Sequence, residues 1–95
     1  MFSKKEFQKV VAAIRKELNK GEYPKALCTG AQMMKNQATV NCGGEGRGES
    51  SKVIAQEVLN HSLFKSFLLA TGSKATLEHK PDYTGKGYTQ IRLYY

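Results

Sequence analysis

Tryptophan is absent from this sequence of 95 residues, cysteine and proline occur twice each, and no run of apolar residues is long. A helix that crosses a bilayer needs about 18 or more consecutive apolar residues, and no segment approaches that length. The opening residues MFSKK also lack the apolar region of a secretory signal peptide. The sequence therefore predicts a soluble, cytoplasmic protein with no membrane partner.

The two cysteines do not have the spacing of a metal site. Cys28 and Cys42 form no CxxC pair and have no histidine close by in the sequence, whereas zinc ligands usually come in closely spaced pairs. Reduced thiols are the default inside a cell. We therefore predict no metal and no cofactor, and the sequence leaves open whether Cys28 and Cys42 meet.

Acidic side chains are scarce: there are 8 aspartates and glutamates against 15 lysines and arginines, which gives a formal net charge of +7. A field of this sign favours polyanions, such as nucleic acid or another polyphosphate, and acidic protein surfaces. A chain of 95 residues has material for one modest core. We predict one small basic domain over residues 1–95, whose oligomeric state stays open.

The segment 3–21 has the pattern of a helix. Ser3 and Glu6 match a capping box, and Gly21 stands where a left-handed cap is expected. Apolar residues recur every three or four positions and predict a buried stripe. Lysines recur on the opposite side and predict a cationic ridge. The alternative interpretation is an ordinary solvated face. The stripe is Phe7, Val11, Ile14 and Leu18, and the ridge is Lys5, Lys9, Lys16 and Lys20.

The rest of the chain predicts two strands, a helix and a hairpin. Strands are expected over 26–32 and 37–42, with a turn near Lys35–Asn36, and Met33 and Met34 are expected in the core. A helix is expected in the segment 50–72, where Ser50 or Ser51 caps the start and Gly72 provides a left-handed cap at the end. A bend or a new start capped by Ser62 is expected where its apolar stripe drifts. The last strands are expected over 74–80 and 88–95. The predicted class is α+β, with two helices packed on one face of a small antiparallel sheet in the order αββαββ.

The segment NCGGEGRGESSK, residues 41–52, is rich in glycine and ends at a predicted helix start. Glycine lets backbone N–H groups approach an anion, and a helix N-terminus attracts negative charge. We predict a phosphate site here, with a loose surface connector as the alternative. Its residues are Arg47, Gly48, Ser51 and Lys52.

Two short stretches resemble known families. The segment Gly46–Lys52, followed by Ala55, is similar to the entry of the second helix in double-stranded RNA-binding domains. That resemblance implies that Arg47 and Lys52 contact phosphates and favours RNA over DNA. The stretch Leu68–Gly72, together with Leu77–Glu78 and Pro81–Asp82, is similar to NADAR-type N-glycosidases, which act on compounds related to ADP-ribose. No catalytic residue is carried over from it.

The last segment, 88–95, alternates strictly between apolar and polar residues. Thr89, Ile91, Leu93 and Tyr95 are expected in the core, which leaves Tyr88, Arg92 and Tyr94 outside. Tyrosine rings beside a guanidinium are suited to stacking on bases, although β-propensity alone also places such residues on a strand.

The same hairpin contains the side chains for an alternative, metal-free catalysis. A ribonuclease needs a base, an acid and a cation near the scissile phosphate, and His79, Tyr83 and Arg92 could supply them if strand pairing brings them together. His61 is expected to be a hydrogen-bonded residue of the core or the bend.

The leading hypothesis is a small binding module for a phosphate-rich partner, most of all nucleic acid, with RNA ahead of DNA. One alternative is a protein-interaction module or small inhibitor, of phage or mobile-element origin, that docks on an acidic protein surface. The other is an enzyme, either a metal-free ribonuclease or a NADAR-like glycosidase. Because no catalytic signature in the sequence is specific, the binding protein is favoured.

Overall fold

The computed structural model describes residues 2–23, 26–43, 50–81 and 87–95, which form three helices and four strands. In chain order the elements are α1 (Lys4–Lys20), β1 (Cys28–Met34), β2 (Gln37–Gly43), α2 (Ser50–Asn60), α3 (Ser62–Thr71), β3 (Lys74–Lys80) and β4 (Tyr88–Tyr94). The predicted α+β class is confirmed. The order is αββααββ instead of αββαββ, because the second predicted helix is divided in two.

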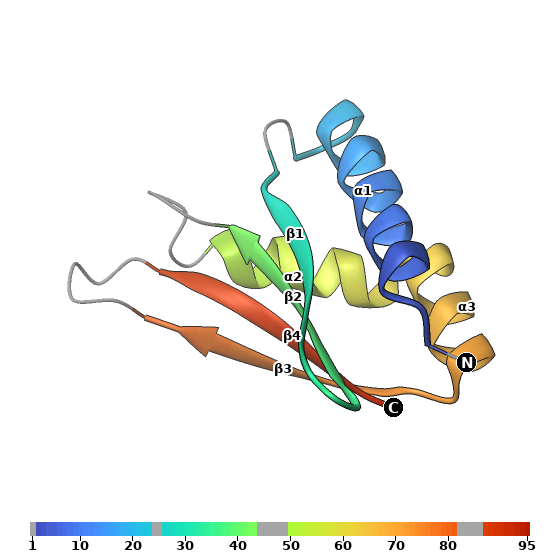
Figure 1. Ribbon diagram of the computed structural model, residues 1–95. Coiled ribbons are helices and arrows are strands. Elements are labelled where there is room, and N and C mark those ends of the chain that lie inside the picture. Colours follow the sequence, from blue (N-terminus) through green and yellow to red (C-terminus); the bar gives the residue numbers. More distant parts are fainter. Residues whose placement is uncertain (1, 24–25, 44–49, 82–86) are drawn as a thin grey trace.

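The strands form one antiparallel sheet in the order β1-β2-β4-β3. Figure 1 shows the helices gathered on one side of this sheet. On β4, Ile91 and Leu93 are fully buried beneath the helices, whereas Tyr88 and Tyr94 are exposed on the other side. We call this second side the open face. By strand alternation its residues are Thr29, Ala31, Gln37, Thr39, Asn41, Gly43, Lys74, Thr76, Glu78, Lys80, Tyr88, Gln90, Arg92 and Tyr94.

Helix α1 follows the predicted capping at its start but not at its end. The Ser3 hydroxyl accepts a hydrogen bond from the Glu6 N–H at 3.4 Å. At the other end, the N–H of Gly21 donates to helix carbonyls, but its φ of −96° is not left-handed, so that part of the prediction is wrong. The predicted stripe of Phe7, Val11, Ile14 and Leu18 is buried.

Gly30 on β1 lets α1 lie directly on the sheet. A Cβ built at Gly30 would stand 2.9 Å from Cε2 of Phe7 and 3.1 Å from Cγ2 of Val11. Interiors are packed so closely that such overlaps force neighbouring groups to shift. The position of α1 therefore depends on the absence of a side chain at this residue.

His61 separates α2 from α3. Its backbone is extended, and its Nδ1 accepts a hydrogen bond from the Leu63 N–H at 3.1 Å, which caps α3. Its Nε2 hydrogen bonds to the carboxylate of Glu17 on α1. The sequence places the break here, where the apolar stripe drifts, but it places the cap at Ser62. At the other end of α3, Gly72 adopts the left-handed conformation that was predicted, with φ 65°.

Residues from α1, α2, α3 and the strands meet in one core. The turn at Lys35–Asn36 occurs as predicted, but Met34 beside it is 57% exposed. The prediction that Met34 fills the core is therefore wrong, because the β1–β2 ladder is irregular between Gln32 and Met34. The Met33 side chain lies outside the described part of the structure. Among the described residues, no helix is long and apolar enough to cross a membrane.

Candidate binding face

The open face carries two exposed aromatic rings on the central strand β4. Tyr88 is 36% exposed and Tyr94 is 42% exposed. They are six residues apart on one strand, which corresponds to roughly 20 Å. Arg92 is two residues from Tyr94 on the same face, or roughly 7 Å. Arg92 and Tyr94 can therefore contact one part of a ligand while Tyr88 contacts another.

A row of hydrogen bonds fixes the polar side chains in the middle of the open face. Nη2 of Arg92 donates to Oε1 of Gln90 at 3.0 Å, and Nε2 of Gln90 donates to Oδ1 of Asn41 at 2.9 Å. A guanidinium can only donate, so the Gln90 oxygen must face Arg92 and its nitrogen must face Asn41. Arg92 thereby sets the orientation of both amides, and Asn41 keeps its NH₂ group for other partners.

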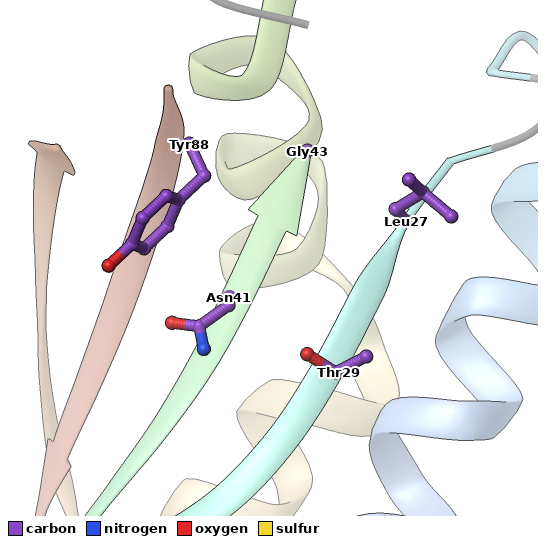
Figure 2. A pocket seen from close by; sticks show the side chains of 5 residues that line it. All are labelled: Leu27, Thr29, Asn41, Gly43 and Tyr88. Carbon is purple, nitrogen blue, oxygen red and sulfur yellow. The ribbon is translucent and has the colours of Figure 1, made fainter. Parts of the chain in front are cut away.

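Beside Tyr88 the open face is hollowed, with a volume of about 260 Å³. The hollow is lined by Leu27, Thr29, Asn41, Gly43 and Tyr88, and Figure 2 shows the Asn41 amide oxygen directed toward β4. Leu27 and Tyr88 supply apolar surface, whereas Thr29 and Asn41 supply hydrogen-bonding groups. Such a lining suits a planar ring with a polar edge.

A lysine stands beside each exposed tyrosine. Lys80 on β3 is opposite Tyr88, and Lys74 is opposite Tyr94. Lys80 also forms an ion pair with Glu78, with Nζ and Oε1 3.2 Å apart. With Arg92 between them, these lysines make the β3–β4 side of the open face a place where aromatic rings and cations alternate.

The predicted phosphate site is described only at its two ends, because residues 44–49, including Arg47 and Gly48, lie outside the described part. Gly43 ends β2 with φ 92° and lines the hollow. Ser51 is fully buried, and its Oγ lies 2.7 Å from Oγ1 of Thr89. Contact between the Ser51 hydroxyl and a phosphate does not fit this burial, whereas Lys52 is exposed.

The predicted cationic ridge lies elsewhere on the molecule. Lys5, Lys9, Lys16 and Lys20 are all exposed. They are on the side of α1 opposite to the stripe that packs on the sheet, so they point away from the open face. The ridge and the tyrosines therefore do not form one continuous surface.

The residues of the catalytic alternative are not brought together. His79 is opposite Thr89 and Arg92 is opposite Thr76, which places the two side chains on opposite faces of the sheet. Nδ1 of His79 lies 3.0 Å from Oγ1 of Thr89 on the helix side. Tyr83 lies outside the described residues. The register thus gives His79 and Arg92 no common site.

Three features of the site escape sequence reasoning. The hydrogen-bonded series Ser51–Thr89–His79 joins α2 to β4 and β3. The roles of Asn41 and Leu27 depend on the pairing of β1, β2 and β4, which local patterns do not encode. The one local signal is the alternation of β2, in which Asn41 follows Gln37 and Thr39 at every second position.

Among the residues that the structure describes, no group of three or more histidines, cysteines and carboxylates is placed to hold a metal ion. Comparison of the chain with family models, with curated proteins and with solved structures found no match. The resemblances to double-stranded RNA-binding domains and to NADAR-type glycosidases therefore stay predictions.

Proposed function

We propose that the protein binds single-stranded nucleic acid on its open face, RNA in preference to DNA. The observation that carries this proposal is the combination on β3 and β4 of separated, exposed tyrosine rings with a cation beside each: Tyr88 with Lys80, and Tyr94 with Lys74 and Arg92. Base stacking on aromatic side chains and attraction of the backbone by cations are the two general components of single-strand recognition.

The spacing of the rings favours a single strand over a duplex. Tyr88 and Tyr94 are roughly 20 Å apart along β4, so they contact different bases of an extended strand. In a duplex the base faces are stacked on each other and closed to these rings. The net charge of +7 supplies the long-range attraction, and the ridge on α1 contributes to that field without touching the ligand.

The hollow gives one base a more defined position. Its polar groups are the Asn41 NH₂, oriented through Gln90 by Arg92, and the Thr29 hydroxyl. Both can donate to carbonyl or ring-nitrogen acceptors on a base edge. Gly43 lines this hollow, and in the sequence it is followed by the glycine-rich segment 44–49. Arg47 and Lys52 are the proposed phosphate contacts.

The test is fluorescence anisotropy with labelled single-stranded RNA, single-stranded DNA and duplex RNA of matched sequence. Tyr88→Leu and Tyr94→Leu should each weaken RNA binding by about 5- to 100-fold, the loss of one stacked base. Leu69→Ala, at an exposed apolar residue of α3, is the control for loss of surface area. Lys74→Ala should weaken binding more than Lys16→Ala, whose lysine points away from the open face.

Affinity should also fall steeply between about 50 and 200 mM salt, because cations that neutralise phosphates release counterions. Equal affinity of the tyrosine variants and the parent would refute the assignment to the open face. Salt-independent binding would refute the whole proposal. Capture of a single acidic protein that survives nuclease treatment would point instead to a protein partner.

A further inference from the structure

Strand β3 is the least covered element of the fold. None of its seven residues is buried, and no strand pairs with its outer edge in the described part of the chain. Leu77 faces the helix side of the sheet, yet it is 37% exposed because the helices pack mainly on β1, β2 and β4. Such an edge presents unpaired N–H and C=O groups that can accept another strand.

The other edge strand, β1, is protected. Helix α1 packs against it, Nη1 of Arg15 donates to the Cys28 carbonyl at 3.4 Å, and its ladder is irregular between Gln32 and Met34. Helix cover and bulges are devices by which natural sheets block edge pairing. The protection of strand β3 consists of the lysines at its two ends, Lys74 and Lys80. Their effect depends on the charge of the residues that lie opposite them.

The hydrogen-bond ladder determines which backbone groups of β3 point outward. The Gly43 N–H donates to the Leu27 carbonyl at 2.7 Å, so these opposite residues form a hydrogen-bonded pair. Hydrogen-bonded and non-hydrogen-bonded pairs alternate in antiparallel ladders. Following this alternation through the registers of β2, β4 and β3 leaves three residues with outward N–H and C=O groups, namely Ala75, Leu77 and His79.

A second copy of β3 can pair antiparallel to this edge about a two-fold axis. An axis at His79 would place Glu78 opposite Lys80, but it would also place the outward groups of Leu77 opposite Pro81, which has no N–H to donate. Charge distinguishes the other registers. With the axis at Leu77, each Lys74 would lie opposite Lys80 of the other copy, which gives two like-charged pairs. With the axis at Glu78, the two Glu78 carboxylates would lie opposite each other. With the axis at Thr76, Lys74 faces Glu78 of the second copy twice, and the outward groups of Ala75 meet those of Leu77. Opposite charges in directly opposed cross-strand pairs are stabilising, and like charges are destabilising.

We propose that the protein self-associates through antiparallel pairing of β3 with β3 of a second copy, in the register centred on Thr76. The two-fold axis is then perpendicular to the sheet, so both open faces lie on the same side of one continuous sheet. Pairing of a single strand gives a small interface, under about 1,200 Å². The dimer is therefore weak, and it forms in a concentration-dependent way. This proposal does not depend on nucleic-acid binding.

Sedimentation velocity from micromolar to near-millimolar protein tests the dimer and its charge pairs. The parent should shift from monomer to dimer over this range. Lys74→Glu and Glu78→Lys should each abolish the shift, and the double variant carrying both changes should restore it. Lys16→Glu, on α1, is the matched control for an altered net charge and should still dimerise.

Cysteine crosslinking tests the register. In the proposed register Thr76 meets Thr76 of the second copy in a non-hydrogen-bonded pair, whose Cα separation of about 4.5 Å is within the range of disulfides. Thr76→Cys should give a crosslinked dimer under mild oxidation in air, in which molecular oxygen accepts the electrons of the two thiols. The parent, whose two cysteines are buried, should not crosslink.

Leu77→Cys discriminates between registers, because Leu77 meets itself only if the axis lies at that residue. Efficient crosslinking of Leu77→Cys and not of Thr76→Cys would overturn the proposed register. A parent that stays monomeric at the highest concentration, together with no crosslink from either variant, would overturn the dimer. Failure of the double charge variant to restore self-association would show that the Lys74–Glu78 pairs do not form.

Discussion

The Sγ atoms of Cys28 and Cys42 lie 3.4 Å apart in the core, where both side chains are buried. The two residues are directly opposite each other on β1 and β2, next to the hydrogen-bonded pair of Leu27 and Gly43. Cross-strand side chains approach most closely in such non-hydrogen-bonded positions. The hydrogen bond with Cys28, together with burial, raises the pKa of the Cys42 thiol. The folded protein therefore holds the Cys42 thiol protonated, and thiolate is the reactive form.

The raised pKa makes stability depend on pH. In the unfolded chain a thiol has a pKa of about 8.5, whereas the folded state keeps the Cys42 proton to higher pH. The contribution of the protonated Cys42 thiol to the free energy of unfolding is complete below the pKa of the unfolded chain. It is lost as pH rises above that value, by roughly 1 kcal/mol near pH 9.5. Urea unfolding under reducing conditions from about pH 7.5 to 9.5 measures this decline. Cys42→Ala should have a flatter profile than the parent, and equal slopes would contradict the explanation.

We expect Gly30→Ala to destabilise the fold by about 1–3 kcal/mol, the usual effect of overpacking. The added methyl group would stand 2.9 Å from Cε2 of Phe7, so α1 has to move away from β1. Ala31→Val adds carbon atoms to the neighbouring residue of the same strand, but on the open face, and should leave stability nearly unchanged. Denaturant midpoints of both variants measure the difference. A fully stable Gly30→Ala protein would show that α1 does not depend on this contact.

His61→Ala removes both the cap of α3 and the link to Glu17. Loss of an N-cap costs about 0.5–2 kcal/mol, and the free energy of unfolding should fall by at least that much. His61→Asn keeps a capping side chain without reaching Glu17, so its stability should lie between those of His61→Ala and the parent. If His61→Asn is no more stable than His61→Ala, the cap does not contribute.

Ser51 and Lys52 are neighbours with different expected roles. Ser51→Ala deletes a buried hydrogen bond to Thr89 and should lower the free energy of unfolding by about 1 kcal/mol, while the folded variant keeps its affinity for RNA. Lys52→Ala, at an exposed residue, should reduce the salt dependence of binding by about one phosphate contact. Anisotropy and urea titrations on the same samples separate the two effects. Weaker binding by folded Ser51→Ala would restore Ser51 to the phosphate site.

Local patterns in the sequence predict most of the elements. The spacing of Phe7, Val11, Ile14 and Leu18 identifies the buried side of α1, and the alternation of residues 88–95 identifies both faces of β4. These predictions agree with the structure because each depends on the geometry of a single helix or strand. The drift of apolar residues near His61 likewise locates the break between α2 and α3.

The candidate site is harder to predict because it depends on pairing between distant segments. The opposite faces of His79 and Arg92, and the closeness of Cys28 and Cys42, follow from registers that no local pattern contains. The burial of Ser51 follows from the packing of α2 against β4. Tyr88 and Tyr94 are assigned correctly to the outer face, whereas the hollow beside Tyr88 requires three strands to be placed together.

The hydroxyl of Thr89 has two hydrogen-bonding neighbours, Ser51 and His79, but only one proton to give. If Nδ1 of His79 carries no proton, Thr89 donates to the ring and must accept from Ser51. If Nδ1 carries a proton, the ring donates and Thr89 turns its own proton toward Ser51. The tautomer of a half-buried imidazole thus determines the direction in which the Thr89 hydroxyl donates. The ¹⁵N chemical shifts of that ring would report whether Ser51, which solvent does not reach, donates or accepts in its bond to Thr89.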